Sequence, residues 1–281
     1  MARRITVSML SAYLYCKRKL FLEYVLGLVE PEKEALVKGS IRHETYDKVN
    51  KIEENIVKSI TENDDFSKIY SKYINAYSSL LRNAILQNKY RLKNVKLPLI
   101  DAYNQIIPFF RTESEIRALN LFKFIEENRV FGEELWDKLI PKIKSEFAID
   151  SPSLELKGII DQIEVYPESY IPIELKTGTM PDQGVWPNHR IQLGAYAVLM
   201  EEKFNKEINE GFVYYLDKRE KRHIVINPFL KQEVRELKEK VRILINNKEL
   251  PETADNENKC AKCGLKDKCS NNTLLNSMLN N

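Results

Sequence analysis

Three residues near the middle of the chain have the types and the spacing of a metal-dependent hydrolytic site. Glu174 follows Asp161 by thirteen residues, and Lys176 comes two residues after Glu174. Alternate residues of a β-strand point to the same face, so Glu174 and Lys176 share one face of a strand. Neighbouring strands lie about 5 Å apart, so an Asp161 on the preceding strand can bring its carboxylate beside that of Glu174.

Two neighbouring carboxylates repel each other unless a cation lies between them, and hard oxygen ligands select Mg²⁺ or Mn²⁺. A metal held there polarises a phosphate and lowers the pKa of a bound water, and a nearby lysine neutralises developing charge. The trio therefore fits metal-assisted phosphodiester hydrolysis. Solvated surface strands also alternate acidic and basic residues, so the trio by itself leaves both interpretations open.

Three more polar residues could join this site. Gln192 and Tyr196 lie four residues apart, on one face of a predicted helix at 189–204. His43 follows Gly39, where a helix is expected to open. Each of these residues also has an ordinary structural interpretation: Tyr196 as a buried core tyrosine, Gln192 as a helix-surface glutamine and His43 as a structural histidine. Beside two carboxylates, however, His43 becomes a candidate metal ligand.

The elements that must position these residues follow from the hydrophobic periodicity. Short β-branched runs predict strands at 143–149, 154–165, 171–175, 212–216 and 223–226. Helical spacing predicts helices at 6–23, 66–81, 189–204 and 234–245, and another around 116–125 after a proline-punctuated segment at 98–108. The region 45–140 should thus be mainly helical, and its aromatic stripes should belong to the core.

Composition bounds the class of protein. The 281 residues include 44 Lys and Arg, 41 Asp and Glu, 43% apolar residues and nine glycines, which excludes disordered and collagen-like chains. The longest uncharged apolar stretches fall short of the roughly 18 residues of a membrane span. The run after Arg3 and Arg4 carries polar residues and no small-x-small cleavage site, so we expect mature, cytoplasmic sequence.

The four cysteines lie at the two ends of the chain, as Cys16 and the cluster Cys260, Cys263 and Cys269. They are too few for a disulfide framework. A redox pair, a zinc site and an iron–sulfur cluster all remain open, although zinc sites usually have two close pairs of cysteines. A shared ligand set would tie the N-terminal helix to the C-terminal tail.

The ordered set resembles a known family. His43, Asp161, Glu174-x-Lys176 and Gln192-x-x-x-Tyr196 together resemble the PD-(D/E)xK nuclease superfamily in its RecB-like branch. The cysteine spacing is similar to that of CRISPR-associated RecB-like exonucleases, which carry an iron–sulfur cluster and act in spacer acquisition. The resemblance covers roughly residues 4–47 and 143–269. Ile160 stands where the superfamily signature has proline, Lys17 follows Cys16 where proline is common, and the intervening helical segment is longer than in compact members.

The resemblance implies a role for each residue. The metal ligands would be His43, Asp161, Glu174 and the backbone carbonyl of Leu175. The catalytic lysine would be Lys176, with Gln192 and Tyr196 orienting substrate and active-site groups and Glu146 supporting the site. The ligands of a 4Fe-4S cluster would be Cys16, Cys260, Cys263 and Cys269.

The expected fold is α/β: a restriction-endonuclease-like core, with a mixed central sheet flanked by helices, a large helical insertion, and an iron–sulfur cap that joins the termini. The expected segments are an N-terminal helical segment at 1–50, the insertion at 51–140, the nuclease core at 141–250 and the cysteine tail at 251–281.

The expected function is Mg²⁺- or Mn²⁺-dependent trimming of single-stranded DNA ends before spacer integration, with endonuclease activity as a possible addition. The resemblance implies the CRISPR integrase and its small companion subunit as partners. The alternatives are a non-catalytic DNA-binding adaptor and a zinc-stapled scaffold protein. Intact Asp161, Glu174 and Lys176 argue against the adaptor.

Overall fold

The computed structural model describes residues 4–247, 249–254 and 256–279. The chain forms two compact units. The sheet unit contains Met1–Pro31, Phe147–Ile163 and Glu168–Asn281, and the helical unit contains Glu32–Glu146 and Glu164–Pro167.

A six-stranded mixed sheet confirms the expected α/β class. Its order is β1-β3-β4-β5-β6, with β2 paired to β3. Strands β1 and β3 are parallel, β4 and β5 are parallel, and β5 and β6 are antiparallel. The strands are β1 Ile5–Thr6, β2 Lys142–Ser151, β3 Leu156–Val165, β4 Tyr170–Lys176, β5 Glu210–Tyr215 and β6 Glu220–Val225. The five strands that periodicity predicts are therefore confirmed, with bounds that differ by a few residues.

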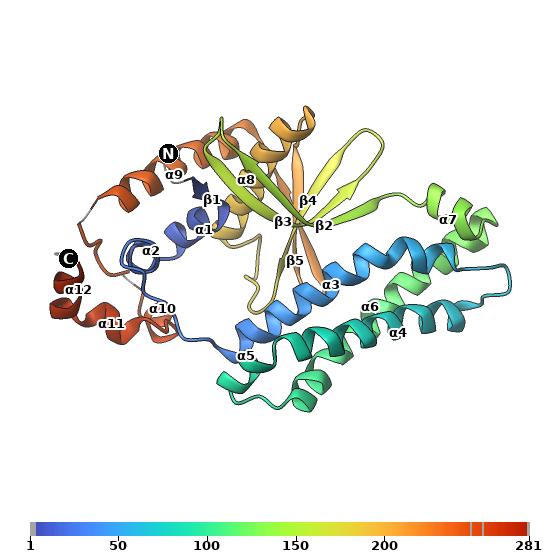
Figure 1. Cartoon of the computed structure of the whole chain (residues 1–281). Helices are drawn as coiled ribbons and strands as arrows, with labels where there is room; N and C mark the ends of the chain where they lie inside the picture. Colours follow the sequence, from blue (N-terminus) through green and yellow to red (C-terminus); the bar gives the residue numbers. More distant parts are fainter. Residues whose placement is uncertain (1–3, 248, 255, 280–281) are drawn as a thin grey trace. The chain divides into compact units, whose positions relative to one another are not determined.

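Helix α8, Pro187–Phe204, makes the crossover from β4 to the parallel strand β5. It packs on β4 and β5, and also on α1, Val7–Tyr15, and on α9, Pro228–Asn246 (Figure 1). Gly194 allows the close approach of α9, since a Cβ at this position would lie 2.8 Å from Leu230 Cγ. Both helices confirm their predictions, and α8 is held from several sides.

The predicted single helix at 6–23 is wrong. Strand β1 comes first, followed by α1, Val7–Tyr15, and α2, Lys17–Tyr24. The break is at Cys16, whose backbone is extended (φ −164°, ψ 111°) and whose Sγ accepts a hydrogen bond from the Lys19 N–H at 3.3 Å. Cys16 thus caps the second helix instead of continuing the first.

Five helices form the helical unit, and α4 packs against both α3 and α6 (Figure 1). They are α3 Glu34–Lys58, α4 Phe66–Gln87, α5 Lys89–Asn94, α6 Leu99–Asn128 and α7 Gly132–Lys138. Tyr73 and Tyr77 of α4 are almost fully buried, which confirms that the aromatic stripe belongs to the core.

Two boundaries in the helical unit differ from expectation. Helix α3 begins at Glu34, so Gly39 lies inside it and is buried, as are Val37 and Ile41. Helix α6 runs through Pro108 although proline removes a backbone hydrogen bond. Burial of the residues on both sides of the proline offsets that loss; they are Ile106, Ile107, Phe109 and Phe110.

The C-terminal tail folds onto α2 of the sheet unit. Its helices are α10 Glu257–Ala261, α11 Lys266–Ser270 and α12 Asn272–Leu279. Leu265 and Leu275 form a small buried core with Leu22. Arg18 donates hydrogen bonds to the carbonyl oxygens of Pro251 at 2.8 Å and Cys269 at 3.0 Å. These contacts join the two ends of the chain.

Among the helices of the described ranges, none has the length and apolar character needed to cross a membrane.

Candidate active site and cysteine pocket

Asp161 on β3 lies against the end of the neighbouring strand β4. Its Oδ2 accepts a hydrogen bond from the Leu175 backbone N–H at 2.7 Å. Leu175 directly follows Glu174, so this bond brings the carboxylates of two adjacent strands to the same part of the sheet.

The Glu174 carboxylate is buried, with 3% of the residue exposed. Lys176 donates to Glu174 Oε1, and Gln192 Nε2 donates to the same oxygen at 2.9 Å. The other oxygen, Oε2, is buried and has no hydrogen-bond partner among the described residues. An unpaired buried carboxylate oxygen is costly, and a hard divalent cation would satisfy it. The donor set therefore fits the predicted metal.

Lys176 keeps its positive charge in this environment. Burial opposes that charge, but the negative charges of Glu174 and Asp161 outweigh burial, and the pKa of Lys176 is raised above its ordinary value. The ammonium is therefore available as a fixed cation beside the two carboxylates.

Tyr196 lies one helical turn after Gln192 and is 4% exposed. Burial, followed by the charges of Glu174 and Asp161, raises its pKa well above the ordinary value, so the phenol keeps its proton. Gly158 on β3 makes room for the ring. A Cβ there would lie 3.1 Å from Tyr196 Cε1 and 2.8 Å from Val7 Cγ2.

His189 adds a residue that the sequence analysis missed. Its Nδ1 lies 3.1 Å from the Tyr215 hydroxyl. Burial, followed by the charge of Lys176, lowers the pKa of His189 to about 3, so the ring is neutral. The signal was present in the sequence, because His189 precedes Gln192 by three residues and shares its helical face.

The remaining predicted site residues, His43 and Glu146, belong to the helical unit. His43 lies on α3 and Glu146 on β2, and their ligand atoms lie within 4.8 Å of each other. Glu146 has a left-handed backbone (φ 48°), which residues other than glycine rarely adopt. The structure thus brings the histidine and this glutamate together within their unit, and brings Asp161, Glu174, Leu175, Lys176, Gln192 and Tyr196 together within the sheet unit.

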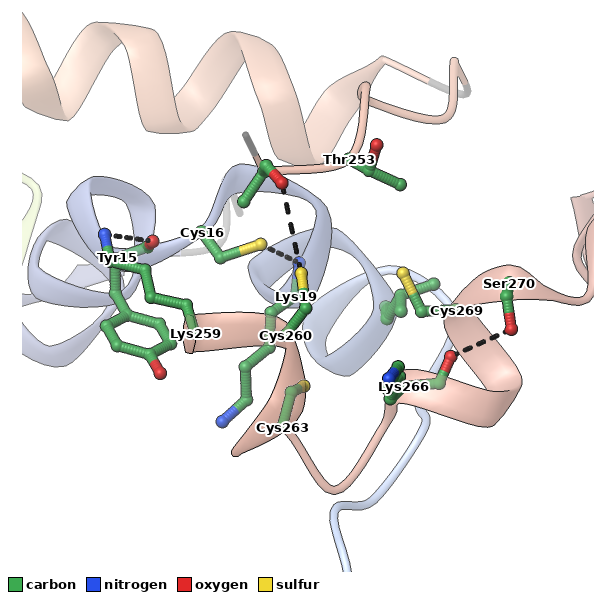
Figure 2. A pocket seen from close by; sticks show the side chains of 12 residues that line it. Tyr15, Cys16, Lys19, Thr253, Lys259, Cys260, Cys263, Lys266, Cys269 and Ser270 are labelled. Atoms are coloured by element: carbon green, nitrogen blue, oxygen red, sulfur yellow. Dashed lines mark hydrogen bonds between the residues drawn. The ribbon is translucent and has the colours of Figure 1, made fainter. Parts of the chain in front are cut away.

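The four cysteines line one pocket of about 190 Å³ in the sheet unit. Cys16 comes from the break between α1 and α2, Cys260 from α10 and Cys269 from α11, while Cys263 lies between those two helices. Figure 2 shows their side chains directed into a common space. All four are free thiols.

The walls of this pocket suit a group bound by thiolates. They are mostly apolar, and they also include Lys19, Lys259 and Lys266. Burial raises the pKa of the Cys269 thiol, so a thiolate at this position needs a positive partner. Four thiolates can hold either zinc or an iron–sulfur cluster, and the residues present fit both.

Comparisons with known proteins agree with this arrangement. The model of the PD-(D/E)XK nuclease superfamily matches residues 4–270. A CRISPR-associated exonuclease Cas4/endonuclease Cas1 fusion of Leptospira interrogans serogroup Icterohaemorrhagiae serovar Lai is 28% identical over 157 residues, which are 52% of this chain and 29% of that protein.

A second fusion of the same description, from Myxococcus xanthus, is 30% identical over 128 residues, 44% of this chain and 22% of the relative. The DNA replication ATP-dependent helicase/nuclease JHS1 of Arabidopsis thaliana is 25% identical over 172 residues, 53% of this chain and 13% of the relative. The chain thus spans less than a third of each of these relatives. The superfamily match extends over most of the chain, which belongs to the PD-(D/E)XK nuclease superfamily.

Proposed function

We propose that this chain is a divalent-metal-dependent DNA exonuclease that trims single-stranded ends. The observation that carries the proposal is the buried Glu174 carboxylate. One of its oxygens is held by Lys176 and Gln192, and the other has no hydrogen-bond partner within the described part of the chain. Membership of a nuclease superfamily supports the same reaction class.

In this proposal the carboxylates of Asp161 and Glu174 and the carbonyl of Leu175 would hold Mg²⁺ or Mn²⁺. A bound cation would polarise the scissile phosphate and lower the pKa of a bound water. The Lys176 ammonium neutralises negative charge that develops on the phosphate. Gln192 fixes the rotation of the Glu174 carboxylate, and the protonated Tyr196 hydroxyl would be available to orient the substrate.

We further infer a role in CRISPR spacer acquisition, with the integrase and its small companion subunit as partners. Two relatives are fusions of a Cas4 exonuclease with a Cas1 endonuclease, which supports this association. Resemblance to the replication helicase/nuclease supports only the nuclease chemistry.

A 4Fe-4S cluster in the cysteine pocket completes the proposal. Closing a loop as long as that between Cys16 and Cys260 favours the folded state by roughly 5 kcal/mol in the chain-entropy model. Anaerobically purified protein should then be brown, with a broad absorption band near ~400 nm. A colourless protein that contains zinc and is fully active would refute the cluster.

The nuclease proposal is tested with partially duplexed DNA that has a single-stranded overhang, labelled at each end in turn. With Mn²⁺ or Mg²⁺, the overhang should shorten progressively while the duplex remains. EDTA should stop the reaction. DNA binding without cleavage in either metal would contradict the proposal and favour an adaptor.

A further inference from the structure

Positive charge is concentrated in one stretch of the helical unit. Residues 66–100 contain seven Lys and Arg and no Asp or Glu, whereas the whole chain has a net charge of only +3. The stretch covers α4, α5 and the turn that leads into α6. Its basic residues are Lys68, Lys72, Arg82, Lys89, Arg91, Lys93 and Lys96.

Three of these lysines surround one hollow. Lys89 and Lys93 lie one turn apart on α5, and Lys96 lies in the turn that follows the helix. Together with Tyr90 they line a surface hollow of about 420 Å³ whose floor includes Leu97. All three lysines are exposed. Their ammonium groups therefore give this face a positive potential.

The lysines of this hollow differ from those of the neighbouring helix α3. On α3, Lys48 pairs with Glu44 and Lys51 with Asp47, so each lysine has a carboxylate four residues earlier. Lys89, Lys93 and Lys96, in contrast, form no ion pair with any carboxylate that the structure describes. An ordinary solvated helix face of alternating charges does not explain them.

Tyr90 supplies an exposed aromatic surface among these charges. It is 70% exposed, whereas Tyr73 and Tyr77 of α4 are 1% and 0% exposed. The Lys89 ammonium lies 5.0 Å from the centre of the Tyr90 ring. Stacking on exposed aromatic rings, combined with cations that contact phosphates, is the usual way to bind unpaired nucleic-acid strands.

We propose that Lys89, Tyr90, Lys93 and Lys96 form a strand-binding surface for single-stranded DNA. The three ammonium groups contact successive phosphates, and a base stacks on Tyr90. The choice of DNA as the polymer rests on the proposed function. An acidic protein would also match the charge, but the exposed ring beside the lysines favours a nucleic-acid strand. The surface is a second contact with substrate, formed by residues other than those that carry the chemistry.

The test is binding of a fluorescent oligothymidine to the full chain, measured by anisotropy over a range of salt concentrations in EDTA, which prevents metal-dependent cleavage. Three variants are compared. The first combines Lys89→Ala, Lys93→Ala and Lys96→Ala, and the second is Tyr90→Ala. The third is a control that also removes three charges, Lys51→Ala, Lys58→Ala and Lys138→Ala, at lysines that are paired with carboxylates.

Loss of three phosphate contacts should reduce the slope of log affinity against log salt by about 2, and lower affinity about 100-fold at 0.1 M salt. Tyr90→Ala should weaken binding roughly tenfold with little change in slope. The control should bind like the wild type. Circular dichroism checks that each variant is folded. Lys89 and Lys93 lie on helix α5, where alanine has the highest helix propensity.

An equal loss of affinity in the first variant and in the control would overturn the proposed strand-binding surface. So would the absence of binding by the wild type. Cleavage by the wild type with unaltered binding by the first variant would overturn the surface and leave the nuclease proposal standing. Binding that depends on these residues, in a protein that never cleaves DNA, would support the surface and contradict the nuclease proposal.

Discussion

Gln192 on α8 donates a hydrogen bond of 2.9 Å to Oε1 of Glu174 on β4. Lys176 donates to the same oxygen, while Oε2 is buried with no hydrogen-bond partner within the described ranges. Both donors therefore fix the rotation of the carboxylate through one oxygen. The arrangement keeps the other oxygen for a ligand, which is what a metal site requires.

Replacing Gln192 with leucine should weaken the metal site without unfolding the chain. The substitution removes the donor and keeps most of the side-chain volume, so the Glu174 carboxylate loses its orientation. We expect the Mn²⁺ concentration for half-maximal cleavage to rise about 10- to 100-fold. Gln232→Leu, at an exposed position of α9, is the matched control. An unchanged Mn²⁺ requirement in Gln192→Leu would show that this hydrogen bond does not orient a ligand.

Gly158→Ala should destabilise the sheet unit by about 1–3 kcal/mol, because the new Cβ would lie 2.8 Å from Val7 Cγ2 and 3.1 Å from Tyr196 Cε1. Urea unfolding measures the loss. Adding Val7→Ala removes the closer contact, so the double variant should lose less stability than the two single changes added together. Strict additivity would mean that the predicted contact does not form.

The stability contribution of His189 should depend on pH in a defined direction. Unfolded His189 takes up a proton below its ordinary pKa of 6.5, whereas the folded ring stays neutral down to about 3. The contribution of the neutral His189 ring to the free energy of unfolding is therefore present above pH 6.5. It is lost as the pH decreases from 6.5 towards 3. Between pH 7.5 and 5.5, the wild type should lose about 1.4 kcal/mol more than His189→Asn. If the free energy of unfolding changed with pH in the same way in both proteins, His189 would not be a buried neutral histidine.

Cys16 has two roles that substitution can separate. Its Sγ caps α2 and also lines the cysteine pocket. Serine keeps the capping ability and loses the thiolate, whereas alanine loses both. Cys16→Ser should thus lose most bound iron and visible absorption, and Cys16→Ala should in addition lose about 1 kcal/mol of stability. Full iron content in Cys16→Ser would remove Cys16 from the ligand set.

Much of the fold could be predicted because periodicity is local. The alternation around Glu174 identified a strand, and the apolar spacing after His189 identified α8. Cys16 could not be recognised as a break, because one extended residue does not disturb a helical pattern. Helix α6 continues through Pro108 because the residues around the proline are buried in the folded unit. The general tendency of proline to interrupt helices does not take that burial into account.

The candidate site was predictable to a similar degree. Spacing placed Asp161, Glu174 and Lys176 on neighbouring strands, as the structure has them. The hydrogen bond from Gln192 to Glu174 depends on how α8 packs against β4, and no local sequence pattern specifies that packing. Exposure likewise separates Tyr90 from the buried tyrosines of α4 only once the helices are packed.

The proposed role of the Asp161 and Glu174 carboxylates is to hold the cation that supports DNA cleavage. Its most direct test is the rate of Mn²⁺-dependent cleavage of an end-labelled single strand by Glu174→Gln, which keeps the shape of the side chain and removes its charge. Glu210→Gln, at an exposed glutamate of β5, is the control. We expect a rate at least about 100-fold lower in Glu174→Gln and an unchanged rate in the control. Equal rates in both variants, or cleavage that persists in EDTA, would contradict it.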